Sequence, residues 1–228
     1  GSRWSVIAGA GKESDVARSS SKGGLDSSLW EAGVRWTGPQ KLSSFEAAYG
    51  KRYFGNSLRA SFTRQAKLLT LSASYSEEPT TETSRLTRAI PTFNVGIDSP
   101  INAPFLLKQA EVTTLLTGSR SSLEVQLYER RRDFGAAGLL NRGDDVRRGV
   151  YGRLARQLSS RSELSFDGSW EEVAIEGRGG IKQAEGGIEL AHEIGADTDL
   201  IFGVRRWERG GAAPFKVVAG YVQVAKKF

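Results

Sequence analysis

The residues that could carry out chemistry in this chain are few. The 228 residues include no cysteine and a single histidine, His192. Thiol catalysis, disulfides and cysteine-based zinc sites are therefore excluded. A serine–histidine–acid triad needs its imidazole in a polar environment beside the nucleophile, but His192 alternates with Leu190 and Ile194 on what reads as an apolar face. We therefore expect no catalytic residue, no metal site and no cofactor.

Three other patterns invite a chemical reading. Glu185 and Glu189 could form a glycosidase pair, but many further acids alternate around them, for which pairing with arginine is the commoner role. The stretch AGAGKES, Ala8–Ser14, lacks the first glycine of a phosphate-binding loop, and no helix follows it. Arg130–Arg132 has neither stacking aromatics nor a matching basic surface, so we predict a solvated strand end and no nucleic-acid partner. The sequence predicts a protein that is not an enzyme.

Alternation of apolar and polar residues governs nearly the whole chain. In SSLEVQLYERRRD, Ser121–Asp133, the leucines and the valine fall on one side of an extended chain and the polar residues on the other. About a dozen segments repeat this pattern, from Trp4–Ala10 to Val218–Phe228, and helical spacing is not sustained anywhere. The sequence therefore predicts an all-β protein of about 12 antiparallel strands.

A half-buried strand of a soluble sheet alternates in the same way as a strand with lipid on one side. A soluble sandwich of this length buries its central strands, which then read as mostly apolar runs. Here the apolar face is thin and rich in alanine and glycine, and strands of roughly 10 residues match the thickness of a bilayer. These features favour a single domain over 1–228, folded as a transmembrane up-and-down β-barrel.

The connections between the segments support this prediction, because short and long links alternate with one exception at 54–57. A membrane barrel has tight turns at its periplasmic rim and longer loops outside, so twelve strands place both termini in the periplasm. The short links are 38–41, 65–67, 118–121, 159–161 and 195–197, and the longer ones are 12–27, 77–105, 133–145, 174–180 and 208–214.

Charged residues on the face opposite the apolar one are predicted to line the lumen. Acids dominate the ninth and tenth strands, and arginines dominate the second to fourth and the seventh to eighth. Either a basic wall faces an acidic one across a water-filled lumen, or the charges interlock and plug it. If arginines border the narrowest point, a weak anion preference follows. The predicted lumen-lining residues are Glu31, Arg35, Glu46, Arg52, Arg59, Glu111, Glu124, Arg130, Arg153, Glu163, Asp167, Glu171, Glu185, Glu189 and Arg205.

Aromatic residues are predicted to form two girdles at the membrane interfaces. Trp30 and Trp36 share a face and lie six residues apart, which is about 20 Å along a strand. Outer-membrane barrels carry such girdles at both interfaces. The predicted interface aromatics are Trp4, Trp30, Trp36, Tyr49, Tyr53, Tyr75, Trp170 and Phe228.

Two short motifs resemble a bacterial family. YGKRYFG, Tyr49–Gly55, followed by YSEEPTT, Tyr75–Thr81, is similar to a signature of outer-membrane β-barrel proteins associated with PEP-CTERM/exosortase systems. Gln109–Asp133 also looks similar to that family. The resemblance implies an outer-membrane location in an exopolysaccharide context, and a terminal aromatic, Phe228, that assembly machinery reads. The pair Gly1-Ser2 resembles a cloning remnant, and the absence of an initiator methionine suggests a processed or truncated chain.

Three classes of function follow from the sequence. A channel or export port for saccharides or small polar or anionic solutes would use the charged lumen directly. A non-conducting scaffold would partner with periplasmic export components through its turns and rim. An outer-membrane enzyme would need a site in the long loops, where no motif supports one. The expected surroundings are outer-membrane lipid and lipopolysaccharide, and the net charge of +6 is compatible with phosphate groups or acidic polymers as neighbours. The sequence does not indicate how many copies of the chain assemble.

Overall fold

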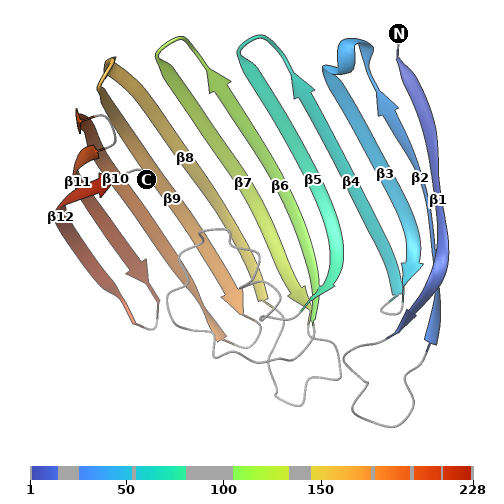
Figure 1. Cartoon of the computed structure of the whole chain (residues 1–228). Helices are drawn as coiled ribbons and strands as arrows, with labels where there is room; N and C mark the ends of the chain where they lie inside the picture. Colours follow the sequence, from blue (N-terminus) through green and yellow to red (C-terminus); the bar gives the residue numbers. More distant parts are fainter. Residues whose placement is uncertain are drawn as a thin grey trace. The chain divides into compact units, whose positions relative to one another are not determined.

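Twelve antiparallel strands make up the chain in the computed structural model (Figure 1), which describes residues 2–14, 26–52, 55–80, 105–133, 145–175, 178–195, 198–211 and 213–226. The strands follow one another in the sheet in the order of the sequence, which confirms the predicted up-and-down all-β fold. Within the described residues, no helix is long and apolar enough to span a membrane. The strands are β1 (Arg3–Ser14), β2 (Asp26–Thr37), β3 (Ser43–Arg52), β4 (Gly55–Gln65), β5 (Leu69–Thr80), β6 (Phe105–Thr117), β7 (Ser121–Asp133), β8 (Asp145–Ser159), β9 (Ser162–Ile175), β10 (Arg178–Gly195), β11 (Thr198–Gly210) and β12 (Phe215–Lys226).

The register of the sheet keeps like residues together on each face. Trp4 lies opposite Trp36 and Val6 opposite Val34 across β1 and β2, while Ile188 of β10 lies between Phe166 and Val204. We call this side of the sheet the apolar face and the other side the polar face. Side chains alternate with a period of two, so a slip of one residue would exchange the two faces.

Burial in this protein is inverted relative to a water-soluble domain. Ala48 and Val173 are the only buried apolar residues in the described part of the chain. The buried polar residues are Arg130, Arg132, Asp145 and Ser165, whereas large apolar side chains are exposed along the strands, with Val222 at 65%. A contiguous uncovered apolar surface marks contact with lipid or a partner, and lipid is what the outer face of a membrane barrel meets.

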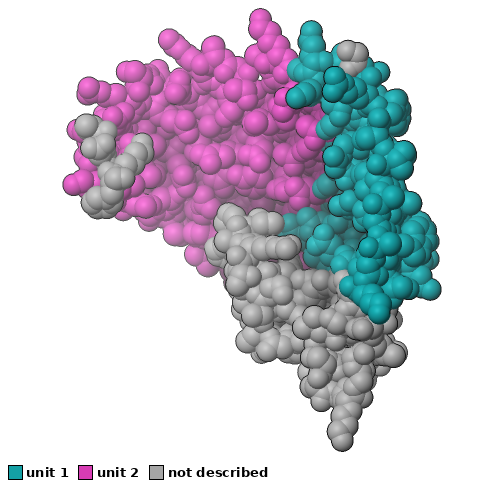
Figure 2. Space-filling model, turned by 45° about the vertical axis from the view of Figure 1, so that its right-hand side comes forward, with its two compact units in different colours: residues 1–62, 74–110, 130–145 teal, residues 63–73, 111–129, 146–228 magenta. Residues whose placement is uncertain are grey.

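Two compact units share the twelve strands (Figure 2), and each is described by itself. Unit 1 comprises residues 1–62, 74–110 and 130–145, and unit 2 comprises residues 63–73, 111–129 and 146–228. Unit 1 contains β1, β2 and β3, and unit 2 contains β9 to β12. The strands β4 to β8 contribute residues to both units.

Strand pairing runs further than the sequence predicts between β9 and β10. A link at 174–180 is predicted, but β9 continues to Ile175, β10 begins at Arg178, and these two residues pair with each other. The extension follows a register shift between Arg178 and Ile181. A β-bulge inserts an extra residue and increases the local twist, which a strict period-two pattern does not reveal. The predicted turn at 38–41 contains a single 3-10 turn, Pro39–Lys41.

Aromatic residues of unit 1 form two ring pairs on the apolar face, one tilted and one edge-on. Trp4 and Trp36 have ring centroids 6.3 Å apart, and Trp30 and Tyr49 have theirs 6.0 Å apart. One pair lies near the turn end of β2 and the other near its loop end.

The remaining predicted interface aromatics lie on other strands. Trp170 is exposed on the apolar face of β9, and Tyr75 donates a hydrogen bond to Glu77 near the loop end of β5. Tyr53 and Phe228 lie outside the described residues. The assignment of these aromatics to the membrane interface stays a prediction.

Candidate functional site

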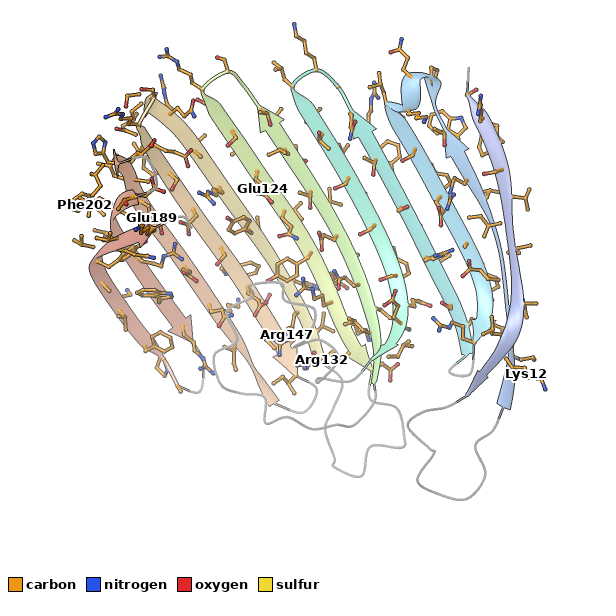
Figure 3. All side chains as sticks on the ribbon, viewed as in Figure 1. Lys12, Glu124, Arg132, Arg147, Glu189 and Phe202 are labelled. Atoms are coloured by element: carbon orange, nitrogen blue, oxygen red, sulfur yellow. The ribbon has the colours of Figure 1, made fainter. Side chains whose placement is uncertain are left out.

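Arg205 of β11 is the centre of a charged cluster on the polar face of unit 2. Its guanidinium lies 2.6 Å from Glu185 and 3.0 Å from Glu189, both on β10, and 3.1 Å from Asp167 on β9. The side chain of Arg205 is 26% exposed. One positive charge therefore meets three carboxylates, and the cluster keeps a net negative charge. Glu189 is labelled on this face in Figure 3, and Phe202 on the apolar face.

Neutral donors complete the cluster. The Tyr221 hydroxyl of β12 donates to Glu189. Next to it, Glu171 of β9 accepts hydrogen bonds from the Tyr128 hydroxyl at 2.7 Å and from the Gln183 amide at 2.9 Å. Such donors satisfy a carboxylate without neutralising it, and hydrogen bonds to an ionised group are stronger than those between neutral groups. The wall is thus fixed in position and still acidic.

Glycines make room for these side chains. A Cβ added at Gly149 of β8 would lie 2.5 Å from the ring of Tyr128, so the ring lies flat over the glycine. Tyr221 covers Gly203 in the same way, and the two residues are direct partners across β11 and β12. A Cβ at Gly187 would come within 3.2 Å of both Asp167 and Arg205. Aromatic cover of a strand glycine also protects the exposed backbone.

The arginines of unit 1 are paired. Arg35 of β2 lies 2.7 Å from Glu46 of β3, and Arg59 of β4 lies 2.6 Å from Glu31 and 3.4 Å from Glu46. These four residues form a neutral ladder across three neighbouring strands. The predicted anion preference rests on arginines that border the narrowest point of the lumen. For Arg35 and Arg59 the structure weakens this prediction, because Glu31 and Glu46 neutralise their charge.

The arginine run at the loop end of β7 is mostly buried. Arg132 donates to Asp145 of β8 at 2.8 Å, and their side chains are only 5% and 7% exposed. Arg130 is also buried, whereas Arg131 is exposed. The prediction of a solvated strand end is therefore wrong for Arg130 and Arg132. The alternation of β7 explains this, because these two residues share the polar face and Arg131 does not.

The other predicted lumen residues also lie on the polar face. Glu111 accepts a hydrogen bond from Thr113 at 3.4 Å. Arg153 lies 3.8 Å from Glu163, and both side chains are about half-exposed. Glu124 on β7 and Arg52 on β3 are half-buried. The structure therefore brings the predicted residues into separate clusters rather than one site. That these residues line a lumen stays a prediction.

Carboxylates outnumber arginines on the polar face of unit 2. Because successive residues of a strand point to opposite faces, the register shows which charged residues lie on the polar face. The summed field of such a face attracts cations and repels anions. The acids are Glu111, Glu124, Glu163, Asp167, Glu171, Glu185, Glu189, Glu193 and Asp199, and the arginines are Arg147, Arg153, Arg205 and Arg209.

His192 lies on the apolar face, as its spacing predicts. It is exposed there, and its Nδ1 is 2.9 Å from the hydroxyl of Ser162, its partner across β9 and β10. The flanking apolar-face residues of β10, Leu190 and Ile194, are exposed too. Among the residues described, no group of three or more histidine, cysteine, aspartate or glutamate side chains could hold a metal ion.

Sequence reasoning missed the neutral members of the unit 2 cluster. Tyr221, Tyr128 and Gln183 hold the carboxylates, and Trp207 shares their face. The signal was present, because Trp207 lies two residues from Arg205, and Tyr221 alternates with the apolar residues of β12. The alternation of charged residues alone does not indicate these neutral ones.

Comparison with known proteins places the fold. No protein family model matches the sequence, and no characterised protein matches it. Among solved structures, an outer-membrane expressed OmpT of Vibrio cholerae is similar with a TM-score of 0.52 and 10% identity over 84% of this chain and 65% of that one. The siderophore receptor PirA from Acinetobacter baumannii is similar with a TM-score of 0.51 and 10% identity over 99% of this chain and 41% of that one. The chain thus has the fold of outer-membrane β-barrel proteins and spans less than two thirds of the length of these two.

Proposed function

We propose that this chain belongs to an outer-membrane β-barrel whose polar face lines a narrow channel for small polar solutes, saccharides included. The observation that carries the proposal is the contrast between the two faces of unit 2. The apolar face is uncovered, whereas the polar face presents carboxylates and tyrosine hydroxyls held in place by hydrogen bonds. Fixed polar groups beside an aqueous path can exchange hydrogen bonds with sugar hydroxyls and water.

The charge balance of this lining favours cations over anions. In unit 2 the three negative charges of the carboxylates around Arg205 outnumber its single positive charge. In unit 1 the ladder of Glu31, Arg35, Glu46 and Arg59 contributes no net charge. Rings of acidic side chains give cation-selective pores. We therefore propose a weak cation preference in place of the anion preference that the sequence predicts.

A non-conducting scaffold is the second candidate. The same ion pairs support it, because interlocked side chains fill a lumen as well as line it. In this case the rim and the turns would contact periplasmic export components. The motifs Tyr49–Gly55 and Tyr75–Thr81 support an exopolysaccharide context for either function, through the family they resemble.

Electrical recording separates the two candidates. The protein, folded from detergent, should show a β-rich circular dichroism spectrum and heat-modifiable gel mobility. In planar bilayers we expect small single-channel conductances and a reversal potential, measured in a salt gradient, that indicates weak cation preference. A monodisperse protein that is soluble without detergent would contradict the membrane location. A folded protein that inserts without conductance would favour the scaffold.

A further inference from the structure

The turn end of unit 2 carries a row of basic residues. Three of its hairpin turns, 66–68, 118–120 and 160–161, each present one basic residue: Lys67, Arg120 and Arg161. All three side chains are exposed. We call these turns and the adjoining strand ends the turn rim.

Backbone hydrogen bonds hold the three turns side by side. Thr117 of β6 donates to Leu68 at 2.8 Å, and Gln157 of β8 donates to Arg120 at 2.8 Å. Glu193 of β10 donates to the carbonyl of Arg161 at 2.8 Å. Successive hairpins are two strands apart, so their tips are separated by about 10 Å. The basic residues therefore form an ordered row at the edge of the sheet, where Figure 1 shows the hairpin turns.

The strand ends next to these turns add further positive charge on the apolar face. Arg64 alternates with Leu58 on β4, and Arg156 lies between Leu154 and Leu158 on β8. Both arginines are exposed. Among the described residues, the turns and the apolar-face ends of these strands include no acidic residue at this edge. Within the described part of the chain, no ion pair involves any of these five basic residues: Lys67, Arg120, Arg161, Arg64 and Arg156.

The opposite end of the same apolar face is different. There, each of four basic residues has a carboxylate partner: Arg148 pairs with Glu129 at 2.9 Å, Lys182 with Glu172 at 3.4 Å, and both Arg206 and Lys216 with Glu208 at 2.7 and 3.4 Å. The charges at the loop end satisfy one another. The charges at the turn rim have no carboxylate partner in the described part of the chain, so they are available to an anion from outside the protein.

We infer that the turn rim binds the phosphate groups of anionic glycerophospholipids. The reason is the apolar surface beside the charges. Leu68 is 55% exposed next to Lys67, and Leu158 is 51% exposed two residues from Arg156. Arginine and lysine side chains at a membrane border extend their charged ends toward the head groups while their stems cover apolar surface. A lipid offers both a phosphate for the cations and an acyl chain for the leucines, whereas a purely anionic polymer such as polyglutamate offers only the charge.

The turn of unit 1 repeats the combination. Lys41 lies in the β2–β3 turn and is followed by Leu42, which is 44% exposed. A basic residue beside an exposed leucine therefore occurs in this hairpin and in the β4–β5 hairpin of unit 2. The repetition is expected if each of these tips meets lipid head groups.

Lipid retention by the folded full chain tests the inference. The protein in nonionic detergent micelles is mixed with phosphatidylglycerol or with phosphatidylcholine, and bound lipids are counted by native mass spectrometry. Each basic residue near an anionic lipid surface contributes about fivefold in affinity. We therefore expect Lys67→Ser/Arg120→Ser/Arg161→Ser to reduce retention of phosphatidylglycerol at least tenfold and to leave phosphatidylcholine unchanged. Raising the salt from about 50 mM to about 500 mM should weaken the wild-type preference.

A matched variant controls for net charge. Arg148→Ser/Lys182→Ser/Lys216→Ser also removes three exposed positive charges from the apolar face, at the loop end. It should retain the phosphatidylglycerol preference, and both variants should keep heat-modifiable mobility as evidence of folding. Equal losses in the two variants, or a wild type without preference, would overturn the inference. So would displacement of phosphatidylglycerol by polyglutamate, or tighter retention of lipid A than of phosphatidylglycerol. The outcome does not depend on whether the barrel conducts.

Discussion

Replacement of Arg205 by methionine tests the unit 2 cluster directly. The variant Arg205→Met keeps a long side chain but removes contacts at 2.6, 3.0 and 3.1 Å to Glu185, Glu189 and Asp167. These carboxylates are between 16% and 28% exposed, so three anions would be left close together with limited access to water. We expect them to repel one another and to destabilise the fold.

The size of the effect follows from the burial of the cluster. Removing one partner of a fully buried ion pair costs about 3–5 kcal/mol. The cluster is partly exposed, which lowers the penalty, but three carboxylates share the lost arginine, which raises it. We therefore expect a loss of about 2–4 kcal/mol in the free energy of unfolding. Urea titration of the protein folded into lipid vesicles, followed by tryptophan fluorescence, measures it.

The neighbouring residue provides the control. Arg206 lies on the apolar face and pairs with Glu208, with side chains 57% and 46% exposed. An exposed pair contributes at most about 1 kcal/mol, so Arg206→Met should change the free energy of unfolding by no more than that. The double variant Arg205→Met/Glu185→Gln should recover part of the loss by removing one of the three anions. Equal effects of Arg205→Met and Arg206→Met would refute the assignment of Arg205 as the centre of the cluster.

Three further predictions concern packing, charge and selectivity. Gly149→Ala should lower the free energy of unfolding by about 1–3 kcal/mol through the clash with Tyr128, whereas Gly152→Ala on the same strand, with its nearest atom at 3.8 Å, should be near neutral in the same titration. Glu46→Gln should leave Arg35 without its carboxylate while Arg59 keeps Glu31, and it should shift the reversal potential toward anions; an unchanged potential would show that Arg35 does not border the conducting path. Tyr128→Phe should leave Glu171 with only its Gln183 partner and lower the free energy of unfolding by about 1.5–3 kcal/mol, and no change would place Glu171 in contact with water.

The faces of the strands were predictable because they depend only on local alternation. The two-residue period assigns Glu189 and Phe202 to opposite faces without any knowledge of their partners, and the structure agrees. The pair Arg35–Glu46 was also within reach of the sequence, because a tight turn between β2 and β3 fixes their register. In both cases the placement depends only on residues close in the sequence, within one strand or one hairpin.

The long-range partners could not be predicted in this way. Arg59 contacts Glu31 from 28 residues away, and Arg205 contacts Asp167 from 38 residues away. Such contacts depend on the stagger across several strands, on the bulge in β10 and on the direction that a long arginine side chain takes. The alternation of charge along each strand restricts the candidates but does not choose among them. The sequence therefore assigned each of these arginines to the correct face but could not show which of them a carboxylate neutralises.

The way in which the polar face is held together also determines what it can do. A salt bridge with one carboxylate for each arginine, as in the ladder of unit 1, fixes the side chains and removes their net field. In the cluster of unit 2, tyrosine hydroxyls and the Gln183 amide do part of the fixing, and these groups carry no charge. The carboxylates there are held in position and remain anionic. Prearranged charge acts on a solute without the cost of reorganising the wall. The cluster of unit 2 should therefore attract cations, whereas the neutral ladder of unit 1 should hold its side chains in place without adding to the field.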